Sequence, residues 1–175
     1  GTEQSGHIAA VGFELYCDLL RRAIDHIEQG GDRVYPQDVD LDLEQVVFAV
    51  SDKRGRLAAS IPAAYVGSER VRIDCYRELR RLDTADKIEA FRRELRDRFG
   101  PVPAAVDTLL ATARIRAAAV KRGVHSVSCR NRRLALQTDD GLLKRPRGGL
   151  PLLESDAPRD QLAEIESHLA DPQRG

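Results

Sequence analysis

Side chains able to carry out acid–base or metal chemistry are few in this sequence, and they stand apart from one another. No two of the four histidines have the i, i+4 spacing of a helical zinc site. Asp25 adjoins His26, but neighbouring side chains point to different faces of a helix, so a catalytic dyad is not expected. We predict no metal or cofactor site and interpret the histidines as surface residues: His7, His26, His125 and His168.

Nucleophile and phosphate-binding motifs are not evident either. Ser126, Ser128 and Cys129 have no G-x-S-x-G context and no identifiable base. Gly148 and Gly149 precede Leu-Pro-Leu-Leu, whereas a phosphate-binding loop continues with Lys and Ser or Thr. The Asp-Asp-Gly sequence at 139–141 is typical of a turn. The sequence therefore predicts a chain without catalytic activity of its own.

The stretch 121–148 is strongly basic, with 8 Lys and Arg residues against 2 acidic residues. Such a stretch could hold the phosphates of a nucleic acid. It contains no aromatic side chain for base stacking, which is the usual second component of single-strand binding. Two interpretations stay open, a solvated basic face or a nucleic-acid contact made by Arg130, Arg132, Arg133, Lys144, Arg145 and Arg147.

Three charged residues near the end of a predicted helix share one exposed face. Glu94, Asp97 and Arg98 are spaced i, i+3 and i+4, opposite the apolar residues of the same helix. One interpretation is simple pairing of Glu94 with Arg98 along the helix. The other is a polar ridge that docks onto a partner surface.

The composition favours a soluble protein with reduced thiols in the cytoplasm. The chain has 175 residues, 28 basic and 28 acidic, and no apolar run long enough to cross a membrane. Its 3 cysteines are scattered, which argues against a disulfide or zinc framework. No signal peptide is visible. Because the sequence lacks methionine, we expect a piece excised from a longer protein.

The pattern in the first third of the chain predicts a helical arm followed by strands. Apolar residues recur at helical spacing from Ile8 to Gln29, and a Gly/Pro-containing linker follows up to Asp38. Residues 39–43 alternate as a half-buried strand does. The runs 46–50 and 57–61 flank turn-forming residues, so a hairpin is expected there.

Helices dominate the remainder of the prediction. Residues 70–82 are ambiguous between strand and helix, and we favour a helix for their later part. Helices are expected over 85–99, capped by Asp83 or Thr84, and over 103–122. Short strands are expected at 124–129 and 133–137, and a last helix after Asp156 and Pro158.

This order of elements predicts an α+β fold, in which a small mixed or antiparallel sheet packs with several helices after a long N-terminal helix. Two parts are expected. Residues 1–37 form a helical arm, and residues 38–175 form an α+β domain. In the helix 103–122 the residues expected to be buried are Val106, Leu109, Leu110, Ala113, Ala117 and Val120.

Three stretches of the sequence resemble transcription-repair coupling factors. The N-terminal stretch 1–20 resembles the segment after their last helicase motif, although the RecG helicase has a similar arm. Ile61-Pro62, Tyr65-Val66, Arg72 and Tyr76-Arg77 resemble their Ile-Pro…Tyr-Ile…Arg…Tyr-Lys-Arg pattern. Residues 94–100, Glu-Leu-Arg-Asp-Arg-Phe-Gly, with Pro103, are similar to their Glu-Leu-x-Asp-Arg-Phe-Gly-x-x-Pro motif. Residues 44–59 look like an insertion relative to the family.

The resemblance implies that 1–37 is the end of the helicase module of an ATP-dependent DNA translocase and that the remainder is its C-terminal regulatory domain. In that family this domain clamps onto an N-terminal UvrB-like module, which hides the surface for UvrA and restrains the motor until the protein meets a stalled RNA polymerase. On the same basis, Glu94, Asp97 and Arg98 are expected in the docking ridge. The alternative is a nucleic-acid-binding accessory domain that uses residues 121–148.

Overall fold

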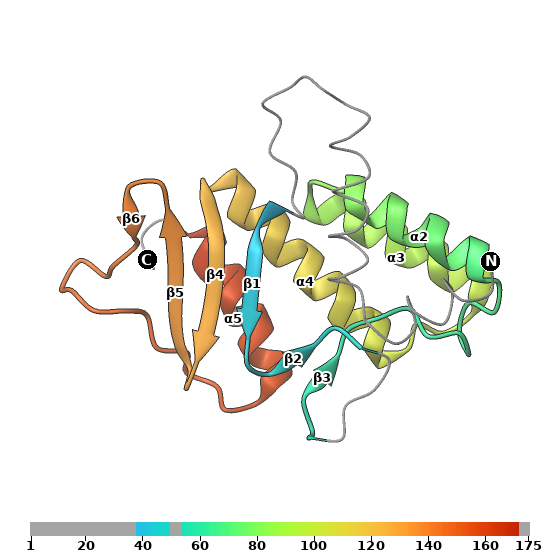
Figure 1. Cartoon of the computed structure of the whole chain (residues 1–175), viewed down its shortest axis with the longest axis horizontal. Coiled ribbons are helices and arrows are strands. Elements are labelled where there is room, and N and C mark those ends of the chain that lie inside the picture. The colour runs from blue at the N-terminus through green and yellow to red at the C-terminus, as the bar shows by residue number, and fades with distance from the viewer. Residues whose placement is uncertain (1–37, 50–53, 172–175) are drawn as a thin grey trace.

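The computed structural model describes residues 38–49 and 54–171. A four-stranded sheet lies on one side, α4 and α5 pack behind it, and α2 and α3 lie beyond α4 (Figure 1). The element bounds are β1 Asp40–Leu43, β2 Val46–Val47, β3 Leu57–Ala58, α2 Glu69–Arg81, α3 Ala85–Phe99, α4 Ala104–Lys121, β4 Val124–Arg130, β5 Arg133–Thr138, β6 Gly141–Leu142 and α5 Pro158–Ala170. This arrangement confirms the predicted α+β fold. The expected N-terminal helix and the boundary at residue 37 lie outside the described residues.

The sheet is mixed and runs in the order β1-β4-β5-β6. β4 and β5 form an antiparallel hairpin whose turn residues Asn131 and Arg132 have φ values of 50° and 62°. Positive φ at both central residues is the turn geometry that matches the twist of two hairpin strands. β1 joins the other side of β4 in parallel, with Asp40 opposite Ser126. The predicted strands at 39–43, 124–129 and 133–137 are therefore confirmed.

The hairpin expected between 46–50 and 57–61 is wrong. β2 and β3 pair in parallel over two residues each, with the Leu57 amide donating to the Gln45 carbonyl at 2.8 Å. The segment after β3 is held by α4 instead, since the Ser60 amide donates to the Ala105 carbonyl at 3.2 Å and Ile61 is buried. The chain after β3 therefore packs against α4 and does not return antiparallel to β2.

Two helices begin where local caps place them. The Ser68 hydroxyl accepts from the Val71 amide at the start of α2, and this helix covers the ambiguous stretch as far as Arg81. The Thr84 hydroxyl accepts from the Lys87 amide at the start of α3, as predicted. Among the described helices, none has both the length and the apolar content needed to cross a bilayer.

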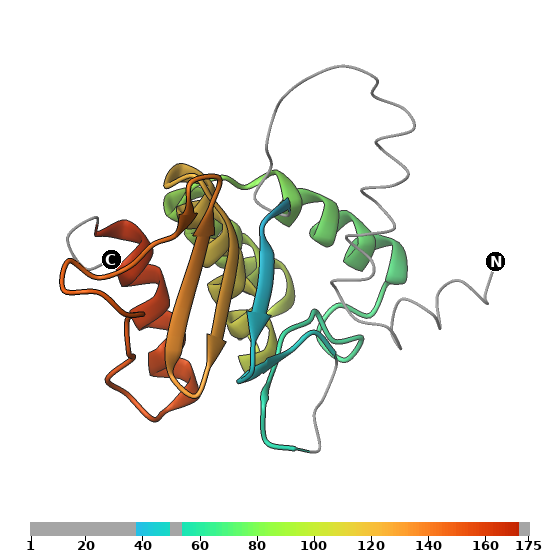
Figure 2. The same cartoon turned by 60° about the vertical axis from the view of Figure 1, so that its left-hand side comes forward.

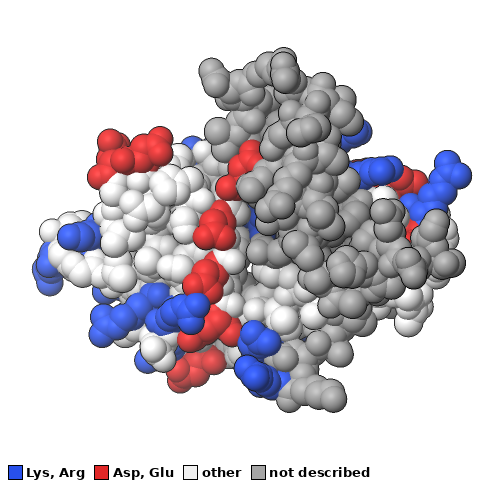
Figure 3. Space-filling view, in the orientation of Figure 1, with Lys and Arg blue, Asp and Glu red and all other residues white. Residues whose placement is uncertain are grey.

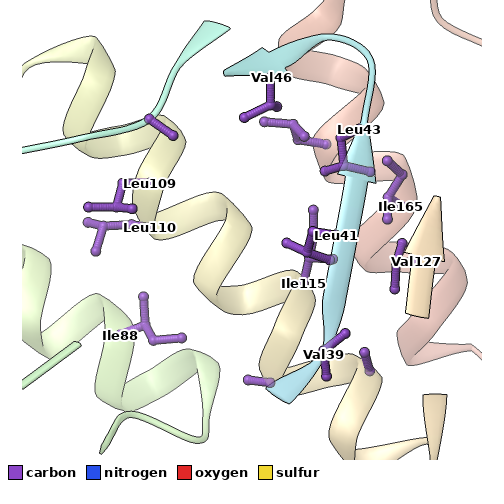
Figure 4. Packing of buried hydrophobic residues seen from close by; sticks show 14 of the residues in the cluster. Val39, Leu41, Leu43, Val46, Ile88, Leu109, Leu110, Ile115, Val127 and Ile165 are labelled. Atoms are coloured by element: carbon purple, nitrogen blue, oxygen red, sulfur yellow. The ribbon is translucent and has the colours of Figure 1, made fainter. Parts of the chain in front are cut away.

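Helix α4 is buried on more sides than the predicted stripe allows. It contacts α3, α5, β3 and β4, so Ile115, Arg116 and Ala119 are buried as well. Ala113 and Val120, expected to be buried, are only half-buried. The residues of α4 and its neighbours that fill this core come from segments far apart in the sequence (Figure 4): Val39, Leu41, Leu43, Ile88, Leu109, Leu110, Ile115, Val127 and Ile165.

Candidate functional site

The three residues of the predicted ridge lie together on the exposed side of α3. Glu94, Asp97 and Arg98 are all exposed, and Leu95 beneath them has no exposed surface. Helix α3 is well anchored, because Ile88 and Phe91 are buried on the same face as Leu95. The ridge is thus a polar surface on a rigid element.

Tyr65, in the loop before α2, contacts the end of α3. The Tyr65 hydroxyl lies 3.0 Å from the Leu95 carbonyl and 2.9 Å from that of Gly100, so it can donate to either. Its ring meets Phe99 edge to face at 5.9 Å between centroids. Gly100 ends the helix with φ of +92°, a conformation that an L side chain rarely adopts.

The Ile-Pro…Tyr stretch has a similar structural role. The Ile61 amide donates to the Tyr76 hydroxyl at 2.7 Å in a buried position, which joins this loop to α2. Arg72 donates to the carbonyls of Val66 and Gly67 at 2.7 Å and 3.2 Å. These matching residues therefore hold the loop, α2 and the end of α3 in place, which the sequence pattern alone did not reveal.

The ridge charges are only loosely engaged with one another. Arg98 lies 3.2 Å from Glu94, and both side chains are nearly half exposed. The Arg98 guanidinium also lies 4.8 Å from the centre of the Phe99 ring. An exposed pair of this kind stabilises a helix by about 0.3–0.5 kcal/mol. The Glu94–Arg98 ion pair can therefore break at little cost in free energy when a partner offers stronger ionic contacts to either residue.

Helix α2 adds a carboxyl group beside the ridge. Partial burial raises the pKa of Glu78, and repulsion from Glu94 raises it further, while Arg98 lowers it. The thiol of Cys75, on the same side of α2, is buried, and burial raises its pKa as well. The ridge thus continues onto α2 as a surface of mixed charge, on which Arg81 and Arg98 act on Glu78 together with Glu94.

We predict a pH-dependent effect of Glu78→Gln on stability. The pKa of the Glu78 carboxyl is raised above its ordinary value in the folded chain, chiefly by burial. The folded state therefore binds the proton more tightly, and stability falls as the pH rises from the unfolded pKa through the folded one. Relative to wild type, Glu78→Gln should therefore be more stable at pH 7 than at pH 4, by about 0.3 kcal/mol in the free energy of unfolding. Urea unfolding at both pH values measures this difference, and an equal pH response of Glu78→Gln and the exposed control Glu89→Gln would contradict the prediction.

The basic stretch divides into two groups. Arg130 donates to both carboxylate oxygens of Asp42, at 2.9 Å and 2.7 Å. Arg132 lies 2.7 Å from Asp156. These two arginines of the predicted nucleic-acid contact therefore tie the β4–β5 turn to its neighbours. The other four, Arg133, Lys144, Arg145 and Arg147, are exposed.

The nucleophile candidates lie in settings of low reactivity. Cys129 has no exposed surface, and burial raises the pKa of its thiol to about 11, so at neutral pH it is protonated. Ser126 and Ser128 stand at alternate positions of β4 and are half-buried. His125 is exposed, with its ring 3.9 Å from Asp139. Within 38–49 and 54–171, no group of three His, Cys, Asp or Glu residues is arranged to hold a metal ion.

The fold and the ridge define a class, an α+β domain with an exposed polar ridge. Comparison with known proteins identifies the family. The model of the TRCF domain matches residues 56–147, and the chain belongs to this family. The match confirms the resemblance inferred from the motifs at 61–77 and 94–103.

Curated relatives carry the same name. The chain is 32% identical over 127 residues to the transcription-repair-coupling factors of Staphylococcus epidermidis RP62A and of Escherichia coli K12, matching 73% of this chain and 10% of theirs. It is 30% identical over 135 residues to that of Buchnera aphidicola, with 75% and 15% covered. The chain thus spans about a tenth of the length of the first two relatives.

A solved structure is also similar, the crystal structure of the C-terminal domain of a transcription-repair coupling factor. Its TM-score is 0.47 at 24% identity, covering 58% of this chain and 56% of the other.

Proposed function

We propose that this chain is a non-catalytic regulatory domain of a transcription-repair coupling factor, and that it acts by intramolecular docking. Its α3 ridge contacts the N-terminal UvrB-like module of the same protein. Docking masks the surface that recruits UvrA and restrains the DNA translocase motor. Release at a stalled RNA polymerase exposes that surface. The chain would act in the cytoplasm, in nucleotide excision repair.

One observation supports this proposal above the others. Within the motif at 94–103, Leu95 and Phe99 pack inward and Gly100 ends the helix with a positive φ. Glu94, Asp97 and Arg98 of the same motif stay on the surface, and the ion pairs Glu94–Arg98 and Asp97–Arg96 are exposed. Charged side chains that are held on a rigid helix and contribute little to folding stability are suited to recognition of a partner.

The energetics of a reversible clamp fit such a surface. A contact within one chain needs to shift an open–closed equilibrium by only a few kcal/mol. Tethering the two parts raises their effective concentration, so a weak contact can remain closed. Exposed charges give specificity and allow release, because their interaction is screened by water and salt.

We expect Glu94→Ala with Asp97→Ala to weaken binding to the separately expressed N-terminal module. Calorimetric titration with the full chain should show a saturable complex for wild type. Loss of two carboxylates from the contact should weaken it by at least about tenfold. In the full-length protein the same change should increase UvrA binding.

The matched control is Glu89→Ala with Asp140→Ala, which removes the same charge at exposed sites away from the ridge. It should bind the module as wild type does. If Glu94→Ala with Asp97→Ala binds the module as tightly as the control, the ridge is not the docking surface. If in addition the full-length double variant resists UvrA as wild type does, the proposed mechanism is wrong.

A further inference from the structure

One face of the sheet is left open by the described helices. Leu134 and Leu136 of β5 are completely buried on the side of α4 and α5, so Arg133, Ala135 and Gln137 point to the opposite face. Figure 2 shows the sheet from a second direction, with the helices behind it. The open face carries Ser126 and Ser128 of β4 in its centre.

Two exposed leucines lie along the outer edge of this face. Leu142 stands opposite Gln137, and Leu152 stands opposite Arg133. Directly opposed residues of antiparallel strands point to the same side of the sheet, so both leucines project onto the open face. Leu142 is 45% exposed and Leu152 is 42% exposed. Among the residues that the structure describes, these two are the large hydrophobic residues with exposed side chains.

The same edge carries a cluster of cations. Arg133 stands at the start of β5, opposite Leu152, and the loop after β6 holds Lys144, Arg145 and Arg147. No ion pair joins these four side chains to another described residue, in contrast to Arg130 and Arg132. In Figure 3 basic side chains lie on the side of this edge, acidic ones form a column over β1, and a separate acidic group lies at the upper left. Asp139 and Asp140 are exposed in the turn that leads into β6.

The loop that presents these cations is closed on itself. The Gly148 amide donates to the Arg145 carbonyl at 2.8 Å, and the Arg145 amide donates to the Gly149 carbonyl at 3.1 Å. Beyond it, the Leu153 amide donates to the Arg132 carbonyl at 2.8 Å, which fixes the returning chain beside β5. The cations and leucines are therefore presented on a single connected edge.

We propose that this edge, made of Arg133, Leu142, Lys144, Arg145, Arg147 and Leu152, binds an acidic segment of a partner protein in which carboxylates are interspersed with apolar side chains. The cations would pair with the carboxylates, and the two leucines would contact the apolar side chains that lie between the carboxylates of the partner. This interaction is separate from the α3 ridge.

A nucleic acid fits the edge less well. Phosphates would use the cations but leave both leucines in water, and bases would find no aromatic surface, because no Phe, Tyr or Trp follows Phe99 in the sequence. Exposed apolar side chains beside charge are instead typical of protein-binding surfaces.

The test measures fluorescence anisotropy of three labelled probes with the full chain: a peptide of Glu, Asp and Leu, a peptide of Glu alone with the same charge, and a short DNA duplex. We expect the leucine-containing peptide to bind most tightly. Leu142→Ser with Leu152→Ser should lower the affinity for that peptide by about tenfold and leave the affinity for the Glu peptide unchanged. Arg145→Glu with Arg147→Glu should lower the affinity for both peptides. The control is Arg70→Glu with Arg93→Glu, at exposed sites on α2 and α3, and it should change neither affinity.

Thermal melts would check that the leucine variants remain folded. If the double variant melts at a lower temperature, the binding measurement is made with the single variants Leu142→Ser and Leu152→Ser instead. The proposal is overturned if the leucine changes leave the affinity of the Leu-containing peptide unaltered. It is also overturned if the duplex binds more tightly than this peptide and loses affinity only with the arginine changes, since that result would assign the edge to nucleic acid.

Discussion

Leu95→Ala is expected to lower the free energy of unfolding by about 2–5 kcal/mol. Leu95 has no exposed surface and lies in the core under the ridge of α3. Truncation removes its buried methyl groups and leaves a cavity that the surrounding helices fill only in part. Urea unfolding followed by circular dichroism measures the loss, which is a large part of the stability of an ordinary domain.

The matched control for this change is Leu142→Ala, at a leucine that is 45% exposed. Its effect should stay within about 0.5 kcal/mol. A loss below about 1 kcal/mol for Leu95→Ala would show that α3 is not packed as described. Under the proposed function, Leu95→Ala should also weaken docking of the N-terminal module, because the ridge residues depend on α3 for their positions.

Tyr76→Phe is expected to lower the free energy of unfolding by about 1–3 kcal/mol. The Tyr76 hydroxyl accepts the hydrogen bond of the Ile61 amide at 2.7 Å, where both groups are buried. Phenylalanine keeps the ring but leaves this amide without its acceptor in a place that water does not reach readily. Thermal or urea unfolding measures the loss, and hydrogen exchange at the Ile61 amide should become faster.

The control for this prediction is Tyr65→Phe, which removes a hydroxyl that is only half-buried. The carbonyls of Leu95 and Gly100 that it contacts lie at the end of α3, where water can replace a lost donor more easily. A smaller loss, about 0.5–1.5 kcal/mol, is expected. If Tyr65→Phe costs more than Tyr76→Phe, the buried Ile61 hydrogen bond is not the stronger link.

Features encoded over a few residues could be predicted from the sequence. Thr84 and Gly100 mark the ends of α3 because a side-chain cap and a positive φ act on their own neighbours. The turn at 131–132 sets the β4–β5 hairpin in the same way. The ridge residues could be placed on one exposed face for a related reason, since helical spacing alone determines which side chains share a face. The family could be inferred from motifs of similarly short length.

Contacts between distant segments were decided only by the tertiary structure. β1 pairs with β4 across more than eighty positions of the sequence, and the chain after β3 is held by the start of α4. Arg116 is buried because its helix is surrounded, although its type suggests an exposed position. Arg130 and Arg133 stand close together in the sequence, yet Asp42 pairs with the first and the second faces solvent. Local patterns report the preferences of a segment, whereas burial and charge pairing depend on which other segments reach it, and that is settled only when the whole core packs.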